Sequence, residues 1–141
     1  MSDSTRWGIL GLGNIAHTFV AGIGALPDAV VVACGSRSAE KAKAFGEKWG
    51  IPRRHGSYEA LVADPDVDAI YVATPHPAHL ENCLLALAHG KPVLCEKPFT
   101  VNAAGTERVI AAAREAGVLV MEGMWTRFLP HVRRTEALIA E

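Results

Sequence analysis

One stretch near the amino terminus decides the fold of this chain: Arg6-Trp7-Gly8-Ile9-Leu10-Gly11-Leu12-Gly13-Asn14-Ile15-Ala16. Trp7 to Leu10 are mostly apolar without alternation, which is typical of a strand covered on both faces in a parallel sheet. Beyond the glycines, apolar residues recur at helical spacing. The stretch therefore predicts a strand, a glycine turn and a helix in direct succession.

The rest of the chain repeats this alternation. Further strands are predicted at 29–34, 53–55, 68–73, 92–95 and 118–121, and helices at 38–49, 57–63, 77–90, 102–117 and 129–141. Strands that alternate with helices in this way form a parallel sheet with right-handed crossovers. We therefore expect one α/β domain, a doubly wound parallel sheet, over residues 1–128.

Composition narrows the class of protein. The chain has 141 residues, half of them hydrophobic, and a formal net charge of −1, so it can bury a core and offers no electrostatic case for a nucleic-acid partner. It contains no run of about 20 apolar residues, so no membrane span is expected. The three cysteines form no C-x-x-C pair and sit among apolar neighbours. We expect a cytoplasmic protein without disulfides or a bound metal.

The glycine turn itself has the spacing Gly11-x-Gly13-x-x-Ala16, which matches a dinucleotide-binding fingerprint. The first glycine permits a tight turn, the second leaves room for a pyrophosphate, and the small third residue lets helix and strand approach closely. Free N–H groups and the positive end of the helix dipole would face the phosphates. A glycine turn can also serve packing alone, but its place at the first strand–helix junction favours dinucleotide binding.

The end of the second predicted strand indicates which dinucleotide binds. Sites for NAD usually present an acidic residue there, whereas a 2′-phosphate needs a cation. Here the strand runs into Ser36-Arg37-Ser38, with no acid among these residues. An arginine between serine hydroxyls can hold a phosphate by charge-assisted hydrogen bonds, so NADP is preferred over NAD. The alternative is that Arg37 is only a solvated residue at the start of a helix.

A candidate for proton transfer follows the fifth predicted strand. Glu96-Lys97-Pro98 lies where that strand ends, at the edge of an open parallel sheet where ligands bind. A lysine there can hold a substrate hydroxyl or assist its proton transfer. The alternative is a surface pair of opposite charges. His76 and His79 have a spacing compatible with metal ligation, but no third ligand is near in sequence and a metal is not expected.

Several segments in order resemble the Gfo/Idh/MocA family of oxidoreductases, and within it the dimeric dihydrodiol dehydrogenases and NADP-dependent aldose dehydrogenases. The matching segments are Gly11 to Ala16, Asp66 to Pro75 with His79, Gly90 to Pro98, and Met121 to Phe128. The resemblance covers nearly the whole chain, and it implies a Rossmann fold and a dinucleotide cofactor.

The resemblance also implies roles for particular residues. It places Gly11, Gly13, Asn14 and Ile15 at the pyrophosphate, Ser36 and Arg37 at the adenosine phosphate, and Thr74, Pro75 and His76 beside the cofactor with His79 close by. Glu96 and Lys97 would lie beside the nicotinamide ribose and the substrate. The peptide bond between Lys97 and Pro98 would be cis. Trp125 and Arg127 would border the nicotinamide.

The expected activity is hydride transfer between NADP(H) and a hydroxyl or carbonyl carbon of a sugar, cyclic diol or related polyol, with Lys97 assisting the proton transfer. Family members continue into a substrate domain, so residues 129–141 are expected to begin the link to a C-terminal domain absent from this chain. A homo-oligomer is expected. The alternative is a nucleotide-binding sensor or regulatory module without catalytic activity.

Overall fold

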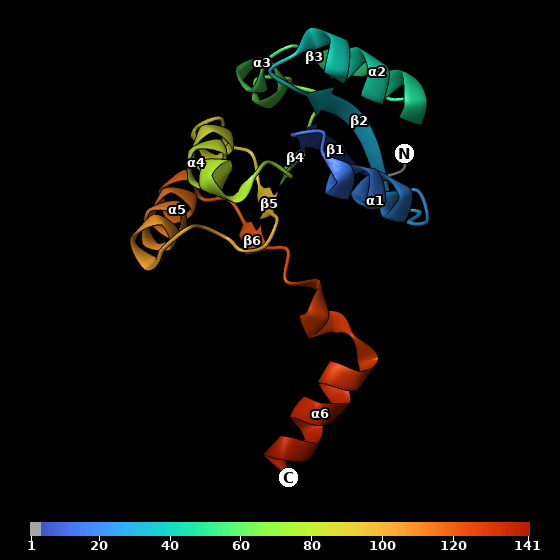
Figure 1. Cartoon of the computed structure of the whole chain (residues 1–141). Coiled ribbons are helices and arrows are strands. Elements are labelled where there is room, and N and C mark those ends of the chain that lie inside the picture. The colour runs from blue at the N-terminus through green and yellow to red at the C-terminus, as the bar shows by residue number, and fades with distance from the viewer. Residues whose placement is uncertain (1–3) are drawn as a thin grey trace.

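The computed structural model describes residues 4–141, and Figure 1 shows how its elements are arranged. In chain order these are β1 (Thr5–Leu10), α1 (Asn14–Ile23), β2 (Ala29–Gly35), α2 (Ala39–Trp49), β3 (Arg53–His55), α3 (Tyr58–Val62), β4 (Ala69–Val72), the 3-10 turn η1 (His76–Ala78), α4 (His79–Ala88), β5 (Val93–Cys95), α5 (Ala103–Ala116), β6 (Val120–Glu122), the 3-10 turn η2 (Trp125–Phe128) and α6 (Pro130–Ala140). The alternation predicted from the sequence is confirmed.

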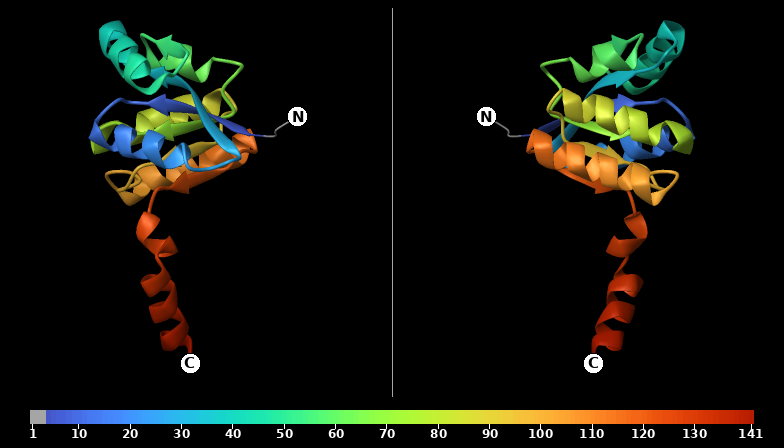
Figure 2. Two further views of the ribbon diagram at one scale, coloured as in Figure 1. Left: turned by 90° about the vertical axis from the view of Figure 1, so that its right-hand side faces the viewer. Right: turned by 90° about the vertical axis from the view of Figure 1, so that its left-hand side faces the viewer.

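The six strands form one sheet in the order β3-β2-β1-β4-β5-β6, and every pairing among them is parallel. Helices α1 and α2 pack on one face of this sheet, and α3, α4 and α5 pack on the other (Figures 1 and 2). Each face buries its own apolar cluster. The predicted doubly wound sheet is therefore the observed one.

Local sequence signals explain where the helices begin and end. The side chains of Ser38 and Asn102 accept hydrogen bonds from the N–H groups of Lys41 and Gly105, at 3.3 and 2.9 Å, so the two predicted N-caps are confirmed. Gly117 ends α5 in the left-handed conformation that glycine adopts without strain. The sixth strand starts later than predicted because the N–H of Val118 bonds back to the carbonyl of Ala113, closing α5.

The strand order reverses beside β1, because the chain proceeds from β1 to β2 on one side and returns to β4 on the other. The loops that follow β1 and β4 are therefore neighbours at the carboxyl edge of the sheet. Gly11 has φ +92°, and a Cβ there would lie 2.8 Å from Cγ2 of Thr74. Only a glycine fits this close approach, which leaves a crevice of the kind that binds ligands in open α/β sheets.

Helix α6 extends away from the sheet and the other helices, as Figure 2 shows in two views. None of its residues is buried. Among residues 4–141, no helix has both the length and the apolar character needed to cross a membrane.

Candidate functional site

A cavity of about 460 Å³ lies at the reversal point of the strand order. The turn after β1, the start of α2, the first residue of α3 and the end of β4 contribute its walls. Its lining residues are Gly11, Leu12, Gly13, Asn14, Ile15, Ser36, Arg37, Ser38, Lys41, Tyr58, Ala73, Thr74 and Pro75. We call it the adenosine-side cavity. Eight of the residues predicted from the sequence as cofactor contacts line it, namely Gly11, Gly13, Asn14, Ile15, Ser36, Arg37, Thr74 and Pro75.

The glycine turn leaves the start of α1 open to this cavity. Gly13 stands at the N-cap position, and no side chain caps the helix there. A Cβ on Gly13 would meet nothing within 4 Å, so the backbone is accessible from the cavity side. The first N–H groups of a helix have no intrahelical acceptor, and the dipole adds partial positive charge. This end of the cavity is therefore suited to an anion such as a pyrophosphate.

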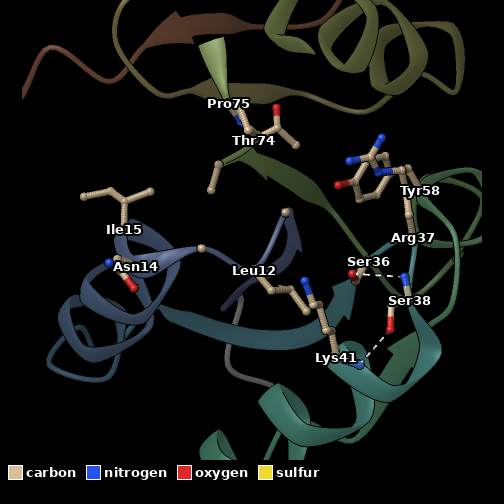
Figure 3. Close-up of a pocket in the computed structure, with 13 residues that line it drawn as sticks. Leu12, Asn14, Ile15, Ser36, Arg37, Ser38, Lys41, Tyr58, Thr74 and Pro75 are labelled. Atoms are coloured by element: carbon tan, nitrogen blue, oxygen red, sulfur yellow. Dashed lines mark hydrogen bonds between the residues drawn. The ribbon is translucent and has the colours of Figure 1, made fainter. Parts of the chain in front are cut away.

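The opposite side of the adenosine-side cavity is positively charged, as the positions of Arg37 and Lys41 in Figure 3 indicate. Both side chains are exposed, and neither has a carboxylate partner among the described residues. The hydroxyl of Ser36 accepts the N–H of Ser38 at 3.2 Å and keeps its own proton to donate. The Ser38 hydroxyl is donated to Glu40 at 2.8 Å, which lowers the pKa of that carboxyl.

Among the polar side chains that line the cavity, those of Lys41 and Tyr58 were not predicted from the sequence. Lys41 lies three residues after the N-cap Ser38, so it projects from the first turn of α2 toward the same edge as Arg37. The three-residue spacing from the N-cap could therefore have indicated Lys41 as a site residue. Tyr58 opens α3, and nothing near it in sequence marks it as a site residue; the folding of β3 and α3 beside β2 brings it to the cavity.

A second cavity of about 570 Å³ adjoins the first, with Ile15 lining both. We call it the nicotinamide-side cavity after the role that the sequence predicts for its members. It lies between α1 and the ends of β5 and β6, and its walls are mainly apolar and aromatic: Ile15, Thr18, Phe19, Tyr71, Leu94, Glu96, Met121, Glu122, Gly123, Trp125 and Phe128. Glu96 and Trp125, both predicted site residues, are brought together here.

Glu96 is held firmly within this apolar cavity. Its Oε1 accepts the hydroxyl of Tyr71 at 2.5 Å, and its Oε2 accepts the backbone N–H of Lys97 at 3.2 Å. Burial, and then the hydrogen bond to Glu96, raise the pKa of Tyr71 far above its usual value, so this phenol remains a donor. Glu122, the other carboxylate of the cavity, accepts the N–H of Phe99 at 2.8 Å. Both acids therefore have defined orientations.

His79 lies beneath the adenosine-side cavity and lines neither cavity. It is fully buried, with Nε2 at 2.9 Å from the carbonyl of Thr74 and Nδ1 at 2.8 Å from the carbonyl of Pro98. Asn82, one turn further along α4, donates to the Thr74 hydroxyl at 3.0 Å. The His79 ring thus lies between the loop after β4 and the loop after β5, and its predicted place close to the cofactor stays a prediction.

The remaining predicted residues are exposed. His76, Lys97 and Arg127 line neither cavity, and none of the three has a carboxylate partner among the described residues. The Lys97–Pro98 peptide is cis, as the resemblance implied. Lys97 follows directly on Glu96, which lines the nicotinamide-side cavity, and its side chain is exposed.

Proteins with this sheet topology bind dinucleotides where the strand order reverses; the adenosine-side cavity stands at that point and the nicotinamide-side cavity adjoins it. The chain is thus a Rossmann-type dinucleotide-binding domain. It belongs to the oxidoreductase family with an NAD-binding Rossmann fold, Gfo/Idh/MocA, whose family model matches residues 5–124.

Curated relatives of this family are similar in sequence over nearly the whole chain. The trans-1,2-dihydrobenzene-1,2-diol dehydrogenase of Xenopus tropicalis is 44% identical over 140 residues, covering 98% of this chain and 42% of that protein. The enzyme of the same name from Homo sapiens is 43% identical over 138 residues, covering 96% of this chain and 41% of that protein. The chain therefore spans about two fifths of the length of these relatives.

Solved structures agree with this assignment. The 3-ketoreductase KijD10 from Actinomadura kijaniata, in complex with TDP-benzene and NADP, superposes with a TM-score of 0.90 at 36% identity, covering 97% of this chain and 43% of that one. An NAD-binding oxidoreductase from Klebsiella pneumoniae gives a TM-score of 0.85 at 28% identity, covering 97% of this chain and 39% of that one.

Proposed function

We propose that this chain binds NADP(H) and serves an oxidoreductase that transfers a hydride to or from a hydroxyl or carbonyl carbon. The observation that carries the proposal is the adenosine-side cavity, which joins an open helix N-terminus to two cations, Arg37 and Lys41, that have no carboxylate partner among residues 4–141. A 2′-phosphate needs such cations, and an acidic residue in their place would repel it. KijD10, 36% identical, was solved with NADP.

The residues present fit this cofactor along its length. Gly11 and Gly13 leave space for the pyrophosphate against the backbone, Asn14 and Ile15 begin the helix that faces it, and Ser36 with Arg37 would hold the 2′-phosphate. Thr74 and Pro75 would border the middle of the cofactor, with His76 at the rim. Glu96, Trp125 and Arg127 would border the nicotinamide half. When bound, the nicotinamide supplies or receives the hydride.

Lys97 is proposed to manage the proton of the substrate oxygen. It follows directly on Glu96, which lines the nicotinamide-side cavity, and its exposed side chain has no carboxylate partner among residues 4–141. An ammonium there can donate a hydrogen bond to a substrate hydroxyl or carbonyl and can exchange a proton with it. In the complete gene product, Lys97→Met should reduce turnover by about 100-fold or more. Unchanged turnover would remove Lys97 from the mechanism.

The substrate is proposed to be a sugar, a cyclic diol or a related polyol, because the similar proteins include dihydrodiol dehydrogenases and a 3-ketoreductase. We propose that residues 129–141, which contain α6, begin the link to a C-terminal substrate domain, with residues 1–128 as the nucleotide-binding domain. Trp125 and Phe128 support this, since they are 61% and 50% exposed beside the nicotinamide-side cavity. Such apolar exposure favours burial against protein.

The same apolar surface underlies a further proposal. We expect the chain to form a homo-oligomer, and light scattering of the purified chain at high concentration would contradict this if it gave a clean monomer.

We also propose that the protein is cytoplasmic. All three cysteines are free and buried, as is usual in a reducing compartment, and burial raises the pKa of the Cys34 thiol to about 11, which makes that thiol a poor nucleophile.

The experiment that tests the cofactor proposal is calorimetric titration of this chain with NADP, NAD and 2′,5′-ADP, which carries the 2′-phosphate but no nicotinamide. NADP should bind about 10-fold or more tightly than NAD, because hydrogen bonds to charged groups contribute about 1.5–3 kcal/mol. 2′,5′-ADP should bind as well. Preference for NAD would overturn the proposal. Binding without turnover by the complete gene product would favour the alternative, a nucleotide sensor or regulatory module.

A further inference from the structure

A phenylalanine at position 71 would fill nearly the same space as Tyr71, so packing alone does not require the tyrosine hydroxyl. Tyr71 belongs to β4, is 2% exposed, and donates to Oε1 of Glu96 at 2.5 Å. Glu96 follows the neighbouring strand β5, whose Cys95 is in register with Val72. The bond therefore connects the end of one central strand to the first residue beyond the next.

The tyrosine ring cannot move to follow Glu96. It stacks on Phe19 of α1, with ring centroids 3.8 Å apart and planes inclined by 11°. Phe19 in turn meets Trp7 edge to face, at 5.5 Å between centroids. Because the ring packs between α1 and the sheet, the position of its hydroxyl is fixed. The side chain of Glu96 therefore takes the conformation that accepts a hydrogen bond from this hydroxyl.

The carboxylate of Glu96 depends on this donor. The nicotinamide-side cavity around it is mainly apolar, and an unpartnered carboxylate in such surroundings is costly. Tyr71 occupies one lone-pair site of Oε1, and the N–H of Lys97 occupies one of Oε2. A carboxylate offers about four such sites, so those that remain are aimed in a set direction and can accept hydroxyl groups.

We propose that Tyr71 is a positioning residue of the nicotinamide side: its hydroxyl sets the conformation of Glu96, which then accepts the ribose hydroxyls of the nicotinamide half. This inference rests on the proposed function, because it assigns the second cavity to that half of NADP. The Glu96 carboxylate, held by Tyr71, also accepts the N–H of Lys97 and so connects the tyrosine to the backbone that carries the lysine.

The test compares two ligands on the same chain. In Tyr71→Phe, the affinity for NADP should fall about tenfold, the loss expected for one hydrogen bond to a charged group. The affinity for 2′,5′-ADP, which does not reach the nicotinamide side, should stay within about twofold of the wild-type value. A purely structural role would change both affinities alike or neither, and either result would overturn the proposal.

A double-mutant cycle with Glu96→Ala shows whether the tyrosine acts through the glutamate. Tyr71→Phe should have no further effect on NADP affinity once Glu96 is removed, because the two residues then act as one unit. Additive losses would overturn the proposal. Failure of the wild-type chain to bind 2′,5′-ADP would instead remove the proposed function, and this inference with it.

A measurement on the unmodified tyrosine keeps the proposal testable if Tyr71→Phe does not fold. A hydroxyl proton that is buried and donated to a carboxylate at 2.5 Å should exchange slowly and resonate far downfield in the proton NMR spectrum. That signal should disappear in Glu96→Ala. Its absence from the wild-type spectrum would overturn the proposal.

Discussion

At the amino edge of the sheet, Arg6 is paired with Asp66 at 3.2 Å and with Asp68 at 2.7 Å, whereas at the carboxyl edge Arg37 and Lys41 have no acidic partner among the described residues. Paired charges satisfy one another and contribute a little to stability. Unpaired cations in a cavity contribute nothing to the empty fold and remain available to a ligand. Charged side chains at the amino edge of the sheet thus contribute to stability, whereas those at the carboxyl edge are available for binding.

The carboxyl edge is held together by other means. Gly11 brings the turn after β1 against Thr74, and His79 joins the carbonyls of Thr74 and Pro98 from below. Steric fit and buried hydrogen bonds shape this edge, so its cations can be left for a ligand. Four substitutions, taken from the largest expected effect to the smallest, test this division.

Gly11→Ala should have the largest effect. The added Cβ would lie 2.8 Å from Thr74 at a φ of +92°, so we expect a loss of about 3 kcal/mol or more in the free energy of unfolding, together with loss of NADP binding. Gly13→Ala is the matched control, since its Cβ meets nothing within 4 Å. It should fold normally and bind NADP more weakly. Urea unfolding and calorimetry measure both, and equal stability losses would contradict the argument.

His79→Ala should lower the free energy of unfolding by about 2–3 kcal/mol, because it leaves a cavity and removes the ring nitrogens that lie 2.8 and 2.9 Å from the carbonyls of Pro98 and Thr74, one of which accepts the ring N–H. His89→Ala is the control: His89 also contacts a carbonyl, that of Leu85 at 2.9 Å, but is exposed and should cost about 0.5 kcal/mol or less. Similar urea midpoints for the two variants would mean that His79 does not hold the loops together.

Arg37→Ala should weaken NADP binding about 10- to 100-fold while leaving NAD binding and the unfolding midpoint unchanged, because its guanidinium has no carboxylate partner among the described residues and is proposed to hold the 2′-phosphate. Arg108→Ala, on the exposed side of α5, removes the same charge without touching either cavity and should alter neither affinity. Calorimetric titration with both cofactors checks this. An equal loss for NAD and NADP would break the assignment of Arg37 to the 2′-phosphate.

Asp68→Asn should have the smallest effect. In contrast to Arg37→Ala, it should change stability and not binding: the free energy of unfolding should fall by about 1 kcal/mol or less, with the NADP affinity unchanged. The hydrogen bond from Arg6 lowers the pKa of Asp68 in the folded protein. The contribution of Asp68 is therefore complete above the ordinary carboxyl pKa and is lost as the pH falls through its lowered folded value. The difference between wild-type and variant urea midpoints should shrink in acid. A pH-independent difference would contradict this.

Much of the fold was predictable because its signals are local. The strand at Trp7 to Leu10, the glycine turn, and the caps at Ser38 and Asn102 depend on residues within a few positions of one another. The eight predicted residues of the adenosine-side cavity follow from the rule that strand ends share an edge. The position of His79 did not follow, because burial beneath a loop depends on α4 and two strands at once.

By itself, the sequence determined the class of this protein: an alternating α/β chain whose first turn can accept a pyrophosphate, with an arginine where a 2′-phosphate would lie. Only the tertiary structure decided that Tyr58 joins that cavity and that Tyr71 holds Glu96. The physical reason is the distance along the sequence over which the interactions act. Propensity, capping and glycine turns act along a few residues, whereas a cavity is made by side chains from strands that meet only when the sheet has formed.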